Sequence, residues 1–114
     1  MSRIIEPREV WRAWVAFEDN PREGKLRPVI VVHVDMKNRF ALTIPIYSRV
    51  AQGEYEIALF DWAEIPIDHL PTANIGKSRP IPFVDMDRRI GSLSSDDWEN
   101  VTQLFQEYAE AHYI

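Results

Sequence analysis

A run of apolar, mostly β-branched residues near the amino terminus constrains the fold more than any other feature of this 114-residue chain. Residues 28–34 read PVIVVHV. Val and Ile favour extended backbone because branching at Cβ stiffens χ1, so the run predicts a buried strand. Pro28 can begin such a strand but could not donate a ladder hydrogen bond inside one. We therefore expect Arg27 at the mouth of a strand, held on a rigid backbone.

The charge on Arg27 has two interpretations. Its guanidinium could form a structural ion pair with a carboxylate such as Glu23 or Asp19. Alternatively it could bind an oxyanion or a phosphate, because its rigid fork of N–H donors suits phosphate oxygens. Arg79 and Pro80 repeat the Arg-Pro arrangement later in the chain. A basic face is therefore expected, with these cations along it: Lys25, Arg27, Arg49, Lys77 and Arg79.

Apolar periodicity predicts further strands. Residues 9–17 and 40–47 alternate well, and the polar residues 35–38 between the second and third strands predict a hairpin. Residues 54–60 predict a fourth strand, and 73–83 a fifth that is weakened by glycine and proline. We expect an irregular excursion over 61–71 and a solvated turn at DMDRR, residues 85–89.

The carboxyl end predicts one amphipathic helix. Ser94 is an N-cap candidate and Asp97 follows three residues later, as in a capping box. Leu93 and Trp98 occupy the positions of a hydrophobic staple. Helical spacing places five apolar residues on one stripe: Trp98, Val101, Leu104, Phe105 and Tyr108. The sequence therefore predicts one domain over 1–114, a mainly-β α+β fold in which a strongly bent antiparallel sheet or barrel packs against a carboxyl-terminal helix.

Composition excludes several classes of function. The chain has no Cys, which excludes disulfides, Cys-ligated zinc and thiol catalysis. His33, His69 and His112 lie too far apart for a metal-ligand spacing, so we expect no metal. No apolar run approaches the roughly 20 residues of a membrane span, and no signal peptide is evident. We therefore expect a cytoplasmic protein with no membrane partner.

Three segments together resemble the MazF/PemK family of toxins. VWRAWVAFEDNPREGKLRPVIVV, residues 10–32, is similar to the family's first signature, in which a tryptophan-bearing strand leads through a loop into Arg-Pro and a Val/Ile strand. LTIPIYSRV, residues 42–50, is similar to the next signature, a strand ending in Pro-x-Thr. RIGSLSSDDWENVTQLFQEY, residues 89–108, is similar to the family's closing segment and last helix. The resemblance covers nearly the whole chain in the right order.

The resemblance implies a small SH3-like barrel, usually dimeric, that cleaves single-stranded RNA without a metal or other cofactor. It also implies a labile antitoxin as partner. Arg27 matches the arginine of the family's Arg-Pro motif and would stabilise charge on the phosphoryl oxygens. Tyr47 stands where the family has a catalytic threonine, and Ser48 follows it. The implied RNA-binding residues are Lys25, Arg49, Lys77 and Arg79.

Two other functions remain open at the level of sequence. The absence of the family's threonine, and of a carboxylate near Asn74 where some members have an aspartate base, favours a non-catalytic barrel that binds a peptide or RNA. A gyrase-poisoning toxin shares the same fold and is the third hypothesis.

Overall fold

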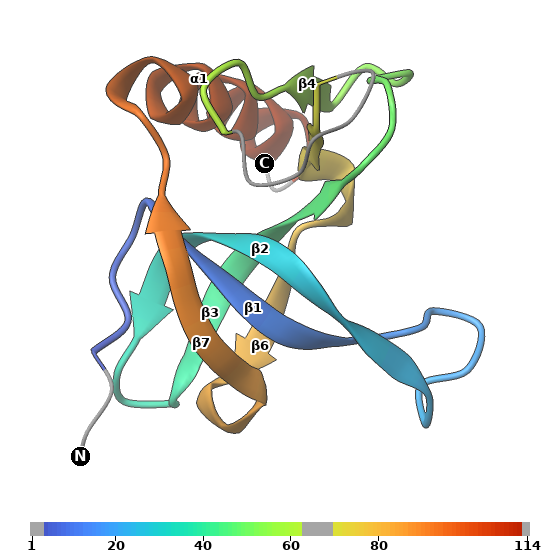
Figure 1. Ribbon diagram of the computed structural model, residues 1–114, viewed down its shortest axis with the longest axis vertical. Coiled ribbons are helices and arrows are strands. Elements are labelled where there is room, and N and C mark those ends of the chain that lie inside the picture. The colour runs from blue at the N-terminus through green and yellow to red at the C-terminus, as the bar shows by residue number, and fades with distance from the viewer. Residues whose placement is uncertain (1–3, 63–69, 113–114) are drawn as a thin grey trace.

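The strands form a single antiparallel sheet that bends around on itself. The computed structural model describes residues 4–62 and 70–112. Within them the sheet order is β4-β5-β3-β2-β1-β7, and β6 also pairs with β3. The strands are β1 (Glu9–Ala16), β2 (Gly24–Asp35), β3 (Phe40–Tyr47), β4 (Glu56–Ala58), β5 (Thr72–Asn74), β6 (Arg79–Pro82) and β7 (Met86–Ser92). Two 3-10 turns, η1 (Ile75–Lys77) and η2 (Phe83–Asp85), precede and follow β6, and the helix α1 (Ser95–His112) comes last. Figure 1 shows these elements, and the mainly-β α+β prediction is confirmed.

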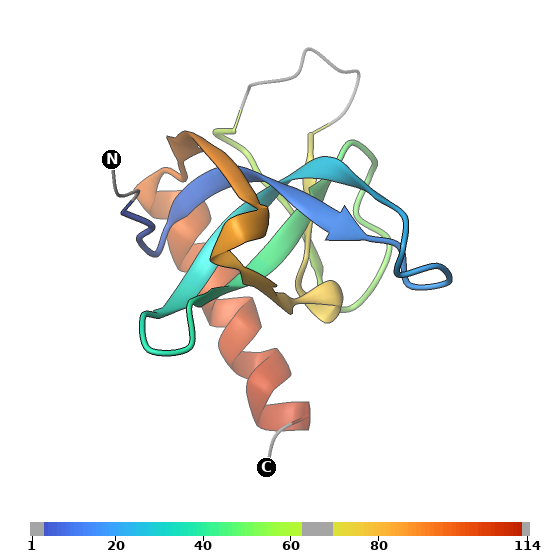
Figure 2. The ribbon, with the colours of Figure 1, turned by 90° about the horizontal axis from the view of Figure 1, so that it is seen from below.

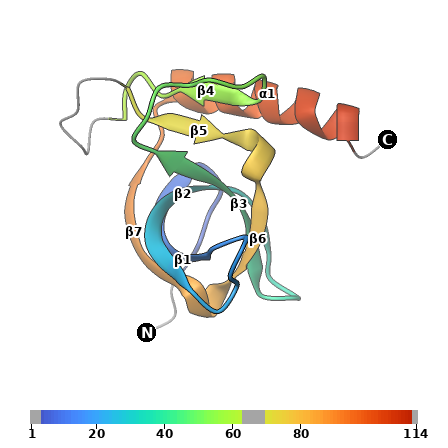
Figure 3. The same ribbon diagram turned by 90° about the vertical axis from the view of Figure 1, so that its right-hand side faces the viewer.

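One face of the sheet encloses a barrel interior. Figure 3 looks along this barrel and shows β1, β2, β3, β6 and β7 arranged around it. Its core contains Trp11, Ala13 and Val15 from β1 together with Val29 and Val31 from β2. Since side chains alternate along a strand, the intervening residues point outward.

The outward face of the same strands forms a second core beneath the helix. Val10, Ile30, Ile44 and Ile46 lie there with Val101 of α1. The Val/Ile run of β2 is therefore apolar without alternation because both of its faces are buried. Figures 2 and 3 show α1 lying across this side of the barrel, with its carboxyl-terminal turns extending past the strands.

The predicted helix and its stripe are confirmed, with one change at its start. The backbone N–H of Asp97 donates to Oγ of Ser94 at 3.1 Å, so Ser94 caps the helix. The carboxylate of Asp97 does not complete a capping box. It is 2% exposed and accepts the backbone N–H groups of Phe60 and Asp61, each at 2.9 Å. Asp97 thus ties the segment after β4 to the start of the helix.

Several strand boundaries differ from the prediction. β2 begins at Gly24 rather than at residue 28, because the hairpin with β1 continues to the pair Ala16 and Gly24. Arg27 therefore lies inside the strand, paired with Ala13, and not at its mouth as predicted. A Cβ on Gly24 would lie 2.3 Å from the carbonyl oxygen of Val15, so this close strand approach requires glycine. β1 ends at Ala16, which leaves Phe17 exposed rather than on the apolar face.

The later strands differ more. The fourth strand is confined to β4, and the expected single strand over 73–83 is divided by η1 into β5 and β6. Residues 85–89 do not form a solvated turn, because Met86 begins β7, which pairs with the edge of β1. Met86 is fully buried while the three charged residues after it are exposed. Much of the expected irregular segment over 61–71, including His69, lies outside the described residues.

We expect Phe105→Ala to lower the free energy of unfolding by about 1–3 kcal/mol, which is less than a fully buried Phe would lose. Phe105 packs against the core beneath the helix but is partly exposed, whereas Val101 on the same stripe is fully buried. Urea unfolding measures the change. Val84→Ala is the control, since Val84 is 87% exposed, and it should stay within about 0.5 kcal/mol of wild type. Equal losses in the two variants would contradict this packing of α1.

Candidate functional site

Arg27 of β2 and Tyr47 at the end of β3 are stacked on each other. Cζ of Arg27 lies 4.3 Å from the centroid of the Tyr47 ring, within the range of a cation–π contact. Arg27 is half-buried, and among the described residues no carboxylate forms an ion pair with it. The ion pair with Glu23 or Asp19 that its sequence context allowed is therefore not formed. The ring fixes the guanidinium without neutralising it.

The stacked pair lines a pocket of about 300 Å³. Its walls come from the end of β1 and the residues after it, from β2 and β3, and from η1 and β6. The lining residues are Val15, Ala16, Phe17, Glu18, Asp19, Arg27, Pro45, Tyr47, Lys77 and Arg79. Four of the predicted site residues therefore meet here: Arg27, Tyr47, Lys77 and Arg79. The Arg-Pro repeat in the sequence reflects two strands that deliver arginines to one pocket.

The pocket also contains two acidic residues: Glu18, which the sequence did not identify, and Asp19, which the sequence suggested only as an ion-pair partner of Arg27. Glu18 accepts two contacts from Nζ of Lys77, at 2.8 and 2.9 Å, and this hydrogen bond lowers the pKa of Glu18 and raises that of Lys77. Asp19 also lines the pocket. Both residues follow the first strand directly, in a polar stretch typical of a loop. Their position in the pocket could have been predicted only from the pairing of β1 with β2, because this loop connects the two strands of the hairpin that contains Arg27.

Arg79 is held by hydrogen bonds to Ala16 and Thr43. Its Nη1 donates to the carbonyl oxygen of Ala16 at 2.9 Å, and its own carbonyl oxygen accepts the hydroxyl of Thr43 at 3.0 Å. These two bonds leave the remaining N–H donors of the guanidinium available at the pocket.

Lys25 and Ser48 line a neighbouring, smaller pocket of about 130 Å³, which Arg27 and Tyr47 also line. Ser48 is exposed, so its hydroxyl is accessible. The two candidate hydroxyl groups therefore differ in place: Tyr47 borders both pockets, and Ser48 only the smaller one.

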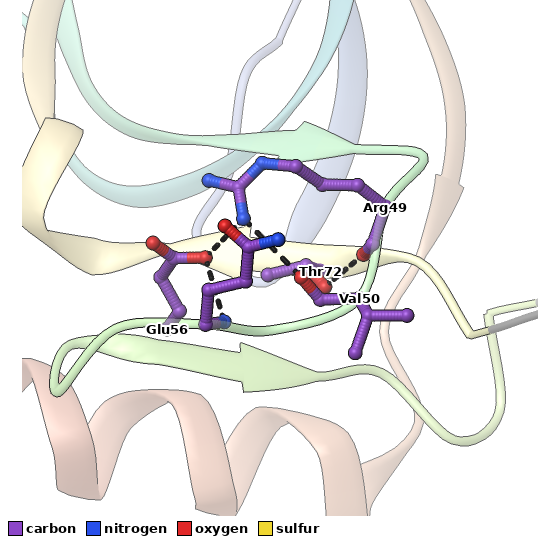
Figure 4. A network of polar contacts seen from close by, with 5 residues as sticks. Arg49, Val50, Glu56 and Thr72 are labelled. Atoms are coloured by element: carbon purple, nitrogen blue, oxygen red, sulfur yellow. Dashed lines mark hydrogen bonds and ion pairs between the residues drawn. The ribbon is translucent and has the colours of Figure 1, made fainter.

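Arg49 is occupied by a structural contact (Figure 4). Its Nη1 forms an ion pair with Oε1 of Glu56 at 2.5 Å, and the hydroxyl of Thr72 donates to its carbonyl oxygen. Its Cζ also lies 5.2 Å from the Tyr47 ring centroid. Arg49 thus links β4 and β5 to the ring that carries Arg27.

The described residues give no sign of a metal site or a membrane span. No three His, Asp or Glu side chains gather there in a way that could hold a metal ion. No helix among these residues is long and apolar enough to cross a membrane.

The sequence matches no family model and no curated protein. The structure, in contrast, is similar to solved MazF structures. A chain of the MazE–MazF complex from Deinococcus radiodurans superposes with a TM-score of 0.72 at 12% identity, covering 96% of this chain and 98% of that one. MazF from the same organism gives 0.71 at 13% identity, with 96% and 99% covered. The Mycobacterium tuberculosis toxin MazF-mt6 gives 0.64 at 18% identity, with 90% and 97% covered.

This chain has a MazF-like fold. The similarity spans nearly the whole length on both sides, so the MazF-like fold includes the barrel, the strands beside it and α1. At these identities the likeness concerns the fold, and the chemistry of the pocket depends on this chain's own residues.

We expect Glu56→Gln to reduce the acid sensitivity of the protein. The hydrogen bond from Arg49 holds the pKa of Glu56 below its ordinary range. The stability from this carboxylate is therefore fully present above the ordinary Glu pKa of about 4.3, and it is lost as the pH falls through the lower pKa of the folded state. Urea unfolding at neutral and acid pH measures this: wild type should lose more stability on acidification than Glu56→Gln. Glu54→Gln is the matched control, because Glu54 is an exposed glutamate two residues away, and it should behave like wild type.

Proposed function

We propose that this chain is the toxin of a type II toxin–antitoxin system and cleaves single-stranded RNA without a metal ion. One observation carries the proposal: within a MazF-like fold, the unneutralised guanidinium of Arg27 is fixed on Tyr47 in a pocket that Lys77 and Arg79 also line. Three cations around one pocket suit a phosphate of the RNA backbone.

The proposed reaction uses the RNA's own nucleophile. The 2′-oxygen attacks the adjacent phosphorus while its proton passes to a base, and the bond from phosphorus to the 5′-oxygen breaks as that oxygen gains a proton. The products are a cyclic phosphate and a free 5′-hydroxyl. Such a reaction needs a proton acceptor, a proton donor and stabilisation of charge on the phosphoryl oxygens.

In this proposal Arg27 stabilises the negative charge on the phosphoryl oxygens. Its fork of N–H donors can contact two phosphoryl oxygens at once, and the Tyr47 ring fixes its orientation before the substrate binds. A guanidinium that is already in place does not need to reorganise as negative charge develops.

The pocket offers two carboxylates for the proton acceptor. Glu18 is paired with Lys77, which weakens it as a base. Asp19 forms no ion pair among the described residues, so we assign the base to Asp19. The hydroxyl of Tyr47 or of Ser48 assists in place of the family's threonine.

The remaining assignments follow from the same proposal. Lys25, Lys77 and Arg79 contact the RNA backbone from the two pockets, and Arg49 contacts the Tyr47 ring. An antitoxin is the proposed protein partner, since one of the similar structures is a MazE–MazF complex. A homodimer and a cytoplasmic location complete the proposal.

We expect Arg27→Lys to slow RNA cleavage by roughly a hundredfold and to change RNA affinity little. Lysine keeps the charge but loses the fork, and an interaction that strengthens only in the transition state affects rate rather than ground-state binding. Cleavage of a mixed single-stranded RNA in chelator, with mapping of the new 5′ ends, measures the rate. Arg39→Lys is the matched control, because Arg39 also stacks on a ring, that of Phe83 at 5.4 Å, outside both pockets.

Two results would overturn the proposal. Cleavage by Arg27→Lys at the wild-type rate would return Arg27 to a structural role. Intact RNA after incubation with the wild-type protein would favour the non-catalytic barrel, or the gyrase poison if DNA gyrase is inhibited instead.

We expect Tyr47→Phe to reduce cleavage and Ser48→Ala to leave it nearly unchanged. Tyr47 borders the pocket that holds Arg27, Lys77 and Arg79, whereas Ser48 lines only the smaller pocket. Both variants should melt like wild type, because each loses one hydroxyl, and Tyr47→Phe keeps an aromatic ring under Arg27. The reverse order of rates would assign the assisting hydroxyl to Ser48.

A further inference from the structure

The smaller pocket has the features of a second ligand site next to the site of cleavage. It adjoins the larger pocket through Arg27 and Tyr47, and its volume is about 130 Å³. Its walls are Lys25, Leu26, Arg27, Pro28, Ile46, Tyr47, Ser48, Trp62 and Pro71. Most of these residues are apolar or aromatic, which differs from the charged larger pocket and suits a flat, apolar ring.

Trp62 is the large aromatic wall of this pocket and is fixed in place. A Cβ on Gly91 of β7 would lie 2.7 Å from Cζ3 of Trp62, so the indole sits directly on a strand position that has no side chain. The residues just before it are anchored to α1, since Asp97 accepts the N–H groups of Phe60 and Asp61, and Ser94 donates its hydroxyl to Asp61 at 2.7 Å. A preorganised ring of this kind loses little entropy when a ligand stacks on it.

Two arginines lie one and two strands away from the pocket wall in β2, and they have no partners among the described residues. Arg12 of β1 lies opposite Pro28 of the pocket wall, and on its other side opposite Arg88 of β7. Both arginines are exposed, and no ion pair or hydrogen bond involves either side chain in the described part of the chain. Like charges directly opposite each other in a sheet destabilise it. An anion bound between Arg12 and Arg88 would remove that repulsion.

We propose that the smaller pocket is a nucleobase subsite, in which one unstacked base of single-stranded RNA lies against Trp62 while Arg12 and Arg88 bind a phosphate next to it. This rests on the proposed function, since it extends the path of the RNA beyond the phosphate held by Arg27. Single-stranded RNA is typically bound in this way, with splayed bases on aromatic rings and the backbone along cations. The juxtaposition of an indole, a cationic pair and the Arg27–Tyr47 wall favours RNA over a peptide.

The first test measures binding rather than cleavage, so that it stands even if Arg27→Lys disproves the reaction. A labelled 2′-O-methyl RNA, which cannot be cleaved, is titrated by fluorescence anisotropy. Trp62→Ala should weaken binding about 10- to 100-fold, and Trp62→Phe less. Phe60→Ala is the matched control: Phe60 is a 66% exposed aromatic on the same segment, outside the pocket, and its backbone N–H remains. Thermal melting establishes that each variant is folded.

An abasic scan identifies the base. Removing one base at a time from the RNA should weaken binding to the wild-type protein most strongly at one position. At that position Trp62→Ala should cause no further loss, because the stacking partner is already gone. Additive losses at every position, or wild-type affinity for Trp62→Ala, would overturn the subsite.

The salt dependence tests the arginine pair. Each lost phosphate contact should reduce the slope of log affinity against log salt by about 0.7 for a single strand. Arg12→Ala and Arg88→Ala should each show this reduction, and Lys37→Ala, an exposed cation in the β2–β3 turn, should not. Unchanged slopes for both arginine variants would contradict the binding of a phosphate by Arg12 and Arg88. Loss of an acidic peptide's binding in these variants, with RNA binding intact, would identify a protein-docking surface instead.

Discussion

The burial of both faces of β1, β2 and β3 is the constraint on which the rest of the structure depends. One face fills the barrel interior. The other face is covered by α1, β4, β5 and the segment that contains Trp62. That cover is incomplete. It protects Val10, Ile30 and Ile44 but leaves Trp14 and Leu26, further along the same face, 40% and 42% exposed. Both candidate pockets include residues near this end of the sheet, so the molecule presents its binding groups where its second core stops.

Charge pairing decides which cations remain available for a ligand. Arg49 is paired with Glu56, and Lys77 with Glu18, so each of these cations is partly neutralised by a carboxylate. Arg27 is held by the Tyr47 ring, which orients a guanidinium without cancelling its charge. Although the chain carries a net charge of −5, its acidic residues thus leave a local surface that can attract a phosphate. Exposed pairs such as that of Lys77 and Glu18 contribute little to stability, so they can open when a stronger anion binds.

The sequence predicted those elements whose signals are local. The signals for α1 all lie within a few turns of one helix: the cap at Ser94, the staple positions and the apolar stripe. The helix begins where these signals predict it. The Val/Ile run gave a strand for the same reason. The signal for β7 is not local. A strand with three consecutive charged residues, Asp87, Arg88 and Arg89, is stable only because it pairs with the edge of β1, and nothing within the segment itself indicates that partner.

The candidate site shows the same division between local and long-range information. The sequence by itself determined that Arg27 adjoins the Val/Ile run of a strand and that Tyr47 ends another, since the apolar pattern marks both strands, but it placed the start of the first strand four residues too late. Only the tertiary structure decided that these two stack, that Lys77 and Arg79 join them, and that Glu18 and Asp19 share their pocket. Only the fold, likewise, placed Trp62 on Gly91 and Arg12 opposite Arg88. Each of these contacts joins residues far apart in the chain or on different elements. Their proximity therefore depends on strand register and on the bend of the whole sheet, which no short stretch of sequence specifies.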